Sequence, residues 1–394
     1  MTPLPLRNGG NAQRFKSLSC DPTGLFPLHG VPSSDRHPAR QALYLDLGSS
    51  RFHILVVVLT DQLHRPLRDL RISVTDRCNF RCTYCMPFDH YDWIDKREIL
   101  TYEEICRVVR LAVPLGVRKI RLTGGEPLVR RDLADLVEQL AGIAGIEDIA
   151  LTTNGSSLSR MAGALRAAGL GRINVSIDSL DPERFRRITK RGDLDEVLKG
   201  LFAARDAGLT PIKINAVIER GVNEEDILPL VEFGREHGFV MRFIEYMDVG
   251  TANAWRLERT VPKAEILERI GARYPLEPIG RGEGNAPAVD YAFRDGKGTV
   301  GIVASVTEPF CGTCSRGRLT ADGRLVTCLF SRTGHDLKAR LRSDAGDDEI
   351  REWLAAVWAG RADRFSADRL HAIQSPDGYD PEQHDKIEMI TLGG

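Results

Sequence analysis

The feature that most constrains the fold of this 394-residue chain is a regular alternation of strand and helix patterns between residues 71 and 247. Apolar and β-branched runs predict strands at 71–75, 119–123, 149–153, 172–178, 212–218 and 240–247. Helical periodicity lies between them at 102–114, 132–141, 158–168, 194–207 and 224–237. Strands joined by helical crossovers pair in parallel with right-handed connections. Eight such units would close a barrel, so six predict an incomplete, six-stranded (β/α) barrel.

The remaining sequence lies on either side of this alternation. Residues 1–60 contain a Gly-Gly pair, a Pro-Ser-Ser run and scattered arginines with little periodicity, which favours a poorly ordered extension. Residues 61–250 form the predicted partial barrel. Residues 251–394 are too few for a second barrel, and we expect an extension, with short strands and a helix near 348–358, that covers the open side. The chain is therefore predicted to have an α/β fold.

Charge and cysteine usage limit the classes of function. A formal net charge of −1 argues against bulk binding to nucleic acid or to a membrane surface. The apolar run Ile54–Leu59 is too short to span a bilayer, and no secretory signal is visible, so a cytoplasmic location is expected. Eight cysteines in such a chain are unlikely to form disulfides. Six of them fall into two tight groups, while Cys20 and Cys106 stand alone and are read as ordinary residues.

The first group follows the first predicted strand with the spacing C-x3-C-x2-C, at Cys78, Cys82 and Cys85. Three thiolates leave the fourth iron of a [4Fe–4S] cubane without a protein ligand. That open iron can bind S-adenosylmethionine through its amino and carboxylate groups, whereas a closed cluster only carries electrons. A zinc loop is the alternative, but zinc sites favour four ligands in paired C-x2-C sets.

Two further motifs accompany this spacing. Tyr84 precedes the third cysteine, and residues 123–127 read T-G-G-E-P at the end of the second strand. The glycines allow close backbone approach, and Glu126 offers an acceptor for an ammonium group. Together the motifs resemble the radical S-adenosylmethionine superfamily. The resemblance implies a cluster that cleaves S-adenosylmethionine to a 5′-deoxyadenosyl radical.

The second group, Cys311, Cys314 and Cys328, has the spacing C-x2-C-x13-C and again no obvious fourth cysteine. A second cubane with a vacant iron, facing the barrel mouth, is the sharper interpretation. A zinc site with His335 as a distant fourth ligand is the alternative.

Arginines follow this group in the run C-x-R-x-R-L-T, from Cys314 to Thr320. Their planar side chains suit phosphate oxygens or a purine edge, although a solvated surface is the ordinary alternative. With an Asp-Gly-Arg motif at 322–324 and the terminal Gly393-Gly394, this pattern resembles the GTP 3′,8-cyclase family of molybdenum cofactor biosynthesis. The resemblance extends from about Leu67 to the last residue.

The resemblance implies site residues, position by position. Those implied to contact GTP are Arg71, Arg121, Thr152, Lys213, Arg316, Gly317 and Arg318. Those implied to contact S-adenosylmethionine are Tyr84, Gly125, Ser176 and Met247. Gly317 departs from the family, which usually has a bulkier apolar residue there. The glycine tail is implied to insert towards the substrate cavity.

The resemblance also implies a reaction and partners. GTP would become (8S)-3′,8-cyclo-7,8-dihydroguanosine 5′-triphosphate in a lyase reaction, after a hydrogen atom leaves ribose C3′ and C3′ attacks guanine C8. The second cluster would anchor the guanine. The implied partners are an electron donor of flavodoxin or ferredoxin type, a downstream cyclic pyranopterin monophosphate synthase that takes the product, and a second copy in a homodimer.

Other classes stay open at this point. A radical peptide-maturing enzyme with an auxiliary cluster is one, although such enzymes commonly have larger cysteine sets. A non-enzymatic iron–sulfur carrier or a zinc-binding regulator is another. No phosphate-binding loop of the Gly-x4-Gly-Lys-Ser/Thr type occurs, so GTP would be a substrate and not a fuel. The segment Gly280-x-Gly-x-Gly284 follows no convincing strand and is read as a flexible loop.

Overall fold

Six parallel strands form the centre of the fold in the computed structural model, which describes residues 40–45, 54–376 and 378–393. They are β3 (Asp69–Ser73), β4 (Lys119–Thr123), β5 (Asp148–Thr153), β6 (Arg172–Ser176), β7 (Ile212–Ile218) and β8 (Val240–Glu245). They pair in this order, and every neighbouring pair is parallel. The six predicted strands are therefore confirmed.

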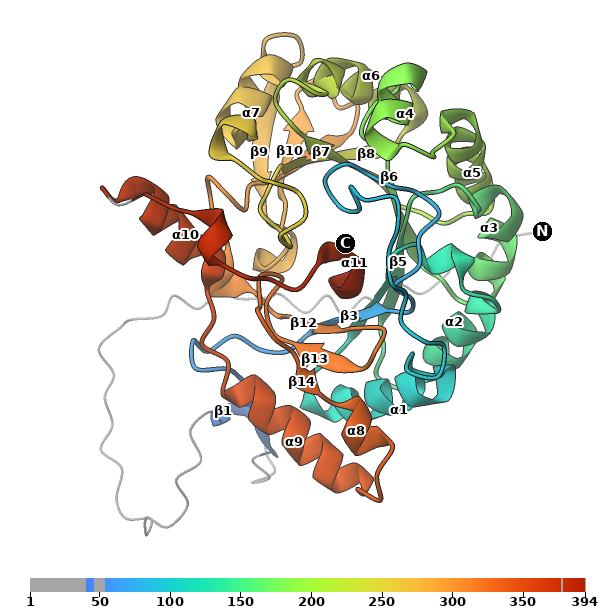
Figure 1. The fold of residues 1–394 in the computed structure, drawn as a ribbon, viewed down its shortest axis with the longest axis vertical. Coiled ribbons are helices and arrows are strands. Elements are labelled where there is room, and N and C mark those ends of the chain that lie inside the picture. Colours follow the sequence, from blue (N-terminus) through green and yellow to red (C-terminus); the bar gives the residue numbers. More distant parts are fainter. Residues whose placement is uncertain (1–39, 46–53, 377, 394) are drawn as a thin grey trace, which may run out of the picture. The chain divides into compact units, whose positions relative to one another are not determined.

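Helices follow the strands and lie on their outer side, in the arc that Figure 1 shows. The predicted ones are α1 (Tyr102–Ala112), α2 (Leu133–Ala141), α3 (Leu158–Ala167), α5 (Leu194–Asp206) and α6 (Ile227–His237). The prediction misses the short helix α4 (Pro182–Thr189) between β6 and α5. Its start is nevertheless encoded locally, because the Asp181 side chain accepts from the Arg184 N–H at 2.7 Å and proline occupies the first helical position.

The C-terminal extension adds strands to both ends of this sheet. β11 (Thr299–Val303) pairs in parallel with β8, and β12 (Arg316–Leu319) pairs in parallel with β3. Antiparallel strands then complete the ends: β10 (Val289–Phe293) and β9 (Leu276–Gly280) on one side, β13 (Arg324–Val326) and β14 (His335–Asp336) on the other. The resulting twelve-stranded sheet is open, since its end strands β9 and β14 do not pair with each other. The partial barrel is thus wider than predicted, because β11 and β12 of the extension pair with its two outer strands, β8 and β3.

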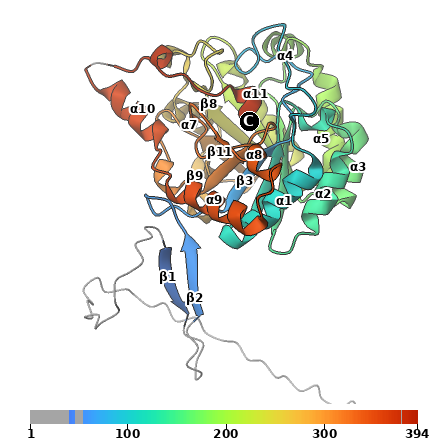
Figure 2. The same ribbon diagram turned by 60° about the horizontal axis from the view of Figure 1, so that its bottom comes forward.

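The helices of the extension are α7 (Lys263–Gly271), α8 (Lys338–Leu341), α9 (Asp347–Ala359), α10 (Phe365–Gln374) and α11 (Met389–Leu392). The helix predicted near 348–358 is α9. It lies beside α1 (Figure 2), where Arg107 forms an ion pair with Asp347 at 2.7 Å. The extension is thereby attached to the barrel's outer layer.

An antiparallel hairpin, β1 (Arg40–Leu45) and β2 (Ile54–Leu59), precedes the barrel. It falls within the segment 1–60 that the sequence predicts to be a poorly ordered extension. Residues 1–39, Cys20 included, and 46–53 lie outside the described residues. Among the residues that are described, no helix is long and apolar enough to cross a bilayer.

Alternation along the strands separates the core from the interior of the barrel. Ile72 on β3 and Leu122 on β4 are fully buried against the helices. Their neighbours in sequence, Arg71 and Arg121, face the opposite side of the sheet and line a cavity. The same alternation that builds the apolar core therefore places basic side chains inside the barrel.

Candidate functional site

A cavity of about 480 Å³ occupies the barrel interior, and all six grouped cysteines line it. Cys78, Cys82 and Cys85 lie on the loop after β3. Cys311, Cys314 and Cys328 come from the extension. The two groups, 226 residues apart at their nearest members (311 − 85), therefore open onto one space.

The first cysteine loop is folded tightly. The Cys82 carbonyl accepts from the backbone N–H groups of Cys85 at 3.0 Å and of Met86 at 2.8 Å. Burial raises the pKa of the Cys78 thiol to about 11, and burial followed by nearby negative charge raises those of Cys82 and Cys85. At these raised pKa values the thiols stay protonated at neutral pH, although Arg81 acts in the opposite direction on Cys78, whereas bound iron would favour the thiolates.

The three thiols of the first cysteine loop fit a cluster with an open iron. Within the described ranges, no three His, Cys, Asp or Glu side chains converge on a point where one ion could bind. A cubane does not require such convergence, because its cysteines bind different irons. A cluster is therefore compatible with the arrangement of these three cysteines.

The T-G-G-E-P turn packs directly on the cysteine loop. A side chain on Gly124 (φ +154°) would meet the Thr75 carbonyl at 2.5 Å, and one on Gly125 would meet the Arg77 carbonyl at 2.4 Å. Gly125 N–H also donates to the Thr75 carbonyl at 2.8 Å. Both glycines are thus required by the close approach of two backbone segments.

Glu126 is engaged by the protein itself. Its carboxylate accepts from Leu128 N–H at 3.0 Å, Thr153 Oγ1 at 2.6 Å and Asn154 N–H at 2.6 Å. Burial raises its pKa to about 7, against these hydrogen bonds. Glu126 therefore connects β4 to the end of β5, and its role towards an ammonium group stays a prediction.

The predicted S-adenosylmethionine contacts line the cavity on the side of the first cysteine loop. Tyr84 donates to Asp178 Oδ2 at 2.7 Å, while the other Asp178 oxygen accepts from Val217 N–H at 2.8 Å. The Met247 sulfur accepts from Ser305 Oγ at 3.2 Å. Ser176 and Gly125 also face this space. Sequence reasoning missed Asp178, although a carboxylate directly after a buried parallel strand is a signal for a site residue.

The second cysteine group has a basic environment. Arg316 Nη2 donates to the Cys314 sulfur at 3.0 Å, and Arg361 Nη1 donates to the Cys314 carbonyl at 2.8 Å. Burial alone would raise the pKa of the Cys314 thiol, but the two arginines lower it to about 6. Burial raises the pKa of Cys328 to about 12. Three thiols on one cavity wall thus fit a second cluster.

His335 does not join this group. It is exposed on β14, packs edge-on against Trp353 at a ring-centre distance of 6.3 Å, and is not among the cavity-lining residues. The zinc alternative with His335 as a ligand therefore has no geometric support.

Basic side chains form a row across the sheet. Arg318 on β12 is in register with Arg71 on β3, which is in register with Arg121 on β4. Arg121 Nη1 donates to Thr152 Oγ1 at 3.4 Å. With Arg316, Lys213 and Arg242, these residues line the cavity, and none of the six cations forms an ion pair with a carboxylate of the described chain.

Burial and crowding lower the pKa values of these cations. Burial, with repulsion from Arg121 and Arg316, lowers the pKa of Arg71 to about 9. Burial, with repulsion from Arg242, lowers the pKa of Lys213 to about 8. Both groups remain mostly protonated at neutral pH, so the cavity holds positive charge that no ion pair of these six cations neutralises, although Asp69, Asp148 and Asp290 also line it.

The C-terminal arm, residues 378–393, ends inside the barrel, as α11 at the centre of Figure 1 shows. Arg318 Nη1 donates to the carbonyl of Gly393 at 2.6 Å and to that of Leu392 at 3.3 Å. A side chain on Gly393 (φ +72°) would meet Thr123 Cγ2 at 2.4 Å. Arg318, predicted as a GTP contact, is thus already bonded to the tail.

A buried ion-pair network anchors this arm. Asp248, directly after Met247, pairs with Arg369 and with Lys386 Nζ, the latter at 2.8 Å. Tyr379 also donates to Asp248. The network attaches the arm to the residue that follows a predicted S-adenosylmethionine contact.

Gly317 is the one predicted site residue that does not line the cavity. It faces the opposite side of β12, where an added side chain would meet Leu67 Cδ1 at 3.1 Å. Alternation along the strand places Arg316 and Arg318 inward and Gly317 outward, so only its backbone could contact a ligand.

Sequence reasoning missed several cavity residues. They are Lys119, Arg172, Asn215, Arg242, Asp290 and the segment 282–287. Arg242 carried a usable signal, because an arginine inside the apolar strand V-M-R-F-I-E is unusual. The prediction that the segment after Gly280 follows no strand is wrong, because β9 ends at Gly280.

Comparison with known proteins identifies the family. Residues 72–234 match the model described as Radical SAM superfamily, and residues 239–367 match Molybdenum Cofactor Synthesis C. The chain is 47% identical over 358 residues to the GTP 3′,8-cyclase of Acidothermus cellulolyticus, covering 85% of this chain and 99% of that one. The chain belongs to the GTP 3′,8-cyclase family. Against the enzyme of that name from Xanthomonas campestris it is 48% identical over 340 residues, covering 85% and 97%.

Solved structures support the fold. Streptococcus suis SuiB bound to the precursor peptide SuiA superposes with a TM-score of 0.55 at 16% identity, covering 78% of this chain and 67% of SuiB. SuiB bound to S-adenosylmethionine gives a TM-score of 0.53 at 16% identity, covering 79% and 69%. At this identity the likeness concerns the fold alone. Family membership makes the chain a radical S-adenosylmethionine enzyme of molybdenum cofactor biosynthesis, which disfavours the peptide-maturing and non-enzymatic alternatives. The family's cofactors are S-adenosylmethionine and [4Fe–4S] clusters.

Proposed function

We propose that this chain converts GTP to (8S)-3′,8-cyclo-7,8-dihydroguanosine 5′-triphosphate. The observation that carries the proposal is the set of six cations without ion-pair partners in the described chain, located in the same cavity as both cysteine groups. A polyanion is the ligand that would pair with these cations. GTP supplies it with its triphosphate.

The triphosphate is assigned to the arginine row and its neighbours. Arg71 and Arg121 are adjacent in register, and Lys213 faces the same space. Charge-assisted hydrogen bonds from these groups would gain strength because the site is partly withdrawn from water. Thr152, bonded to Arg121, is placed to contact the same ligand.

S-adenosylmethionine is assigned to the opposite end of the cavity. Tyr84, Gly125, Ser176 and Met247 line this end, and Asp178 orients Tyr84. S-adenosylmethionine carries positive charge on its sulfonium and amino groups. The buried carboxylates of Glu126 and Asp178 near the first cysteines provide a favourable field for those charges.

Cys78, Cys82 and Cys85 would hold the first cluster, which when bound supplies the electron that cleaves S-adenosylmethionine. Cys311, Cys314 and Cys328 would hold the second, beside Arg316, where the guanine would be anchored. The residues of the cavity would then keep ribose C3′ within reach of the adenosyl group while C3′ bonds to C8. The tail at Gly393 would help to exclude water. A backbone contact from Gly317 completes the proposed set.

The partners follow from this reaction. A one-electron donor of flavodoxin or ferredoxin type must reduce the first cluster. A downstream cyclic pyranopterin monophosphate synthase would take the product. A homodimer is a further prediction of the family resemblance, and a cytoplasmic location stays a prediction from the sequence.

The test is an anaerobic incubation of reconstituted protein with dithionite, S-adenosylmethionine and GTP. We expect 5′-deoxyadenosine and the cyclised triphosphate in matched amounts, measured by liquid chromatography and mass spectrometry. Omitting GTP should leave only slow, uncoupled cleavage of S-adenosylmethionine. Cleavage that GTP neither accelerates nor couples to a guanosine product would refute the assignment.

A further inference from the structure

The carboxyl-terminal end of α4 carries a cluster of cations on the outside of the barrel. Arg186, Arg187, Lys190 and Arg191, called here the basic edge, are all exposed. Within the described chain, none of them pairs with a carboxylate, although Lys190 Nζ donates to the Pro87 carbonyl at 2.5 Å. Arg97 and Arg364, exposed elsewhere, each have an aspartate partner, whereas the exposed Arg110 and Arg160 have none within the described chain. The basic edge differs from these single positions because its four unpaired cations lie within six consecutive residues, 186–191.

Backbone hydrogen bonds attach the basic edge to the first cysteine loop. Arg81 N–H donates to the Thr189 carbonyl and Thr83 N–H to the Ile188 carbonyl, both at 2.9 Å. Lys190 reaches the same loop beyond Cys85, at Pro87. The end of α4 thus supports the backbone on both sides of Cys82, and a molecule bound to the basic edge would lie beside the loop.

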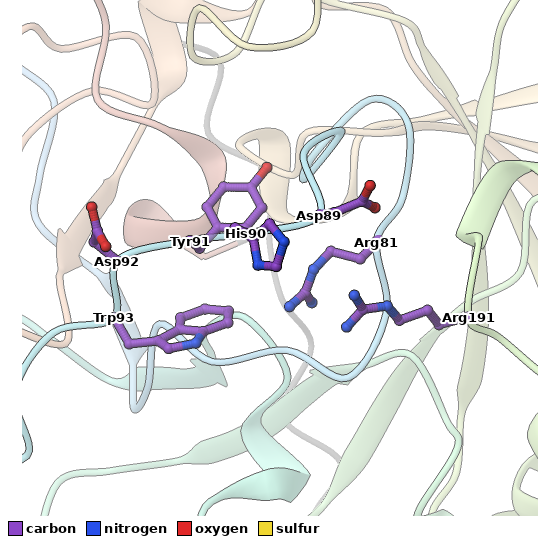
Figure 3. Close-up of a pocket in the computed structure, with 7 residues that line it drawn as sticks. All are labelled: Arg81, Asp89, His90, Tyr91, Asp92, Trp93 and Arg191. Atoms are coloured by element: carbon purple, nitrogen blue, oxygen red, sulfur yellow. The ribbon is translucent and has the colours of Figure 1, made fainter.

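A hollow of about 530 Å³ opens next to this edge. In Figure 3, Arg81 and Arg191 extend side by side towards Tyr91, His90 and Trp93. The Arg81 guanidinium lies 5.6 Å from the Tyr91 ring centre and 5.3 Å from that of Trp93.

Arg81 connects this hollow to the cysteine loop. Its Nη1 donates to the Cys78 carbonyl at 2.9 Å and to the Phe80 carbonyl at 2.7 Å. Its buried Nε has no hydrogen-bond partner in the described chain. The Arg81 side chain therefore links the hollow directly to the backbone of Cys78, a proposed cluster ligand.

We propose that the basic edge and this hollow form the docking surface for an acidic one-electron carrier protein. The inference rests on the proposed function, in which the cluster of this loop takes up one electron for each S-adenosylmethionine cleaved. The carrier loses that electron and the cluster gains it, with no atom transferred. Charge complementarity selects the partner, since unpaired arginines attract an acidic surface and steer its approach.

A nucleic acid is a poorer match for the same cations. Asp89 and Asp92 also line the hollow, and they would repel a continuous phosphate backbone. A folded acidic protein can place its carboxylates on the basic edge alone. Its redox centre would then face the hollow.

The experiment uses flavodoxin as the probe and reconstituted full-length enzyme. The test variant is Arg187→Glu/Arg191→Glu. The matched control is Arg110→Glu/Lys297→Glu, which reverses two exposed charges of α1 and of the turn between β10 and β11. Binding of oxidised flavodoxin is measured by titration calorimetry. Cleavage of S-adenosylmethionine is measured with reduced flavodoxin and, separately, with dithionite.

We expect the test variant to weaken flavodoxin binding about tenfold or more, and to raise the half-saturating flavodoxin concentration equally. Dithionite-driven cleavage and the iron content should match the wild type, and the control should bind flavodoxin normally. Added salt should weaken binding to the wild type more than to the test variant.

Equal loss in the control and test variants would overturn the proposal, as would tighter binding of single-stranded RNA than of flavodoxin by the wild type. If the Glu variant loses iron, the neutral pair Arg187→Gln/Arg191→Gln decides: unchanged flavodoxin affinity in that variant refutes the docking surface. Dithionite-driven formation of the cyclised GTP product by the wild type tests the proposed function separately, because it requires no docking.

Discussion

The two cysteine groups differ in how they are built and in the charge around them. Cys78, Cys82 and Cys85 share one loop that α4 and the T-G-G-E-P turn support. Cys311 and Cys314 precede β12, whereas Cys328 follows β13. Near the first group lie the buried carboxylates Glu126 and Asp178; beside the second lie Arg316 and Arg361.

The difference indicates that the cavity is divided electrically. One end favours a cation and the other an anion, which matches the opposite charges of S-adenosylmethionine and GTP. Two thiols differ in the same way: burial and then Glu126 raise the pKa of Cys78 to about 11, while arginines lower that of Cys314 to about 6. Cys328 of the second group does not follow Cys314, because burial raises its pKa. Variants at the two ends should therefore separate the two half-functions.

The largest expected effect comes from removing either cysteine group entirely. Replacing Cys78, Cys82 and Cys85 by Ala should abolish cleavage of S-adenosylmethionine, because no open iron remains to bind it. Replacing Cys311, Cys314 and Cys328 by Ala should halve the iron, from about eight to about four per chain, and abolish cyclisation while leaving slow cleavage measurable. Iron analysis and product assays check both. Zinc in the second site of anaerobically prepared protein would contradict the assignment of a second iron–sulfur cluster.

The next effect concerns the anionic end alone. Arg71→Ala should weaken GTP binding roughly ten- to a hundredfold, since a charge-assisted contact is worth about 1.5–3 kcal/mol. Affinity for S-adenosylmethionine should change little, because its proposed contacts lie at the other end. Calorimetric titration of each ligand tests this, with Arg110→Ala on the exposed face of α1 as the control. An equal loss of affinity for GTP and for S-adenosylmethionine would mean that the two ends of the cavity do not act independently.

Much of this division was predictable from the sequence, because the features concerned are local. Strand periodicity located β3 to β8, and cysteine spacing located both groups. Once the strands are known, alternation places Arg71 and Arg121 on the inner face. These signals lie within a few residues of one another.

What the sequence did not predict depends on contacts between distant segments. β11 and β12 widen the sheet through pairing with β8 and β3, and their short runs have no periodicity of their own. The contact between Asp178 and Tyr84, 94 positions apart, cannot be predicted from either segment alone. The family resemblance implies that Gly317 contacts GTP. Which face of the sheet this residue occupies depends on the pairing of β12, and Gly317 lies on the face away from the cavity.

A smaller effect is expected from the tail, which reaches both ends of the cavity. Gly393 contacts Thr123 near the first cysteine loop and accepts from Arg318 near the second. Deleting Gly393 and Gly394 should preserve iron content and uncoupled cleavage while reducing cyclised product about tenfold, the value of one charge-assisted hydrogen bond of about 1.5 kcal/mol. Ordering the tail costs about 1–2 kcal/mol per residue, so these contacts must compensate. Wild-type cyclisation by the truncated enzyme would exclude the tail from the site.

The smallest effect is a pH dependence confined to the anionic end. Burial and Arg242 lower the pKa of Lys213 to about 8, and the charged form of lysine is the protonated one. A polyanion binds that form better, so GTP affinity should be full below this pKa and fall as pH rises through it. Between pH 7 and 8.5 the protonated fraction falls about fourfold for such a group, which sets an upper limit for the loss of affinity. Lys213→Arg should flatten the profile, since arginine stays charged over this range. S-adenosylmethionine affinity should show no matching decline, because Lys213 lies outside its proposed contacts. A decline shared by both ligands, or one that persists in Lys213→Arg, would assign the titration to another group and weaken the electrical division of the cavity.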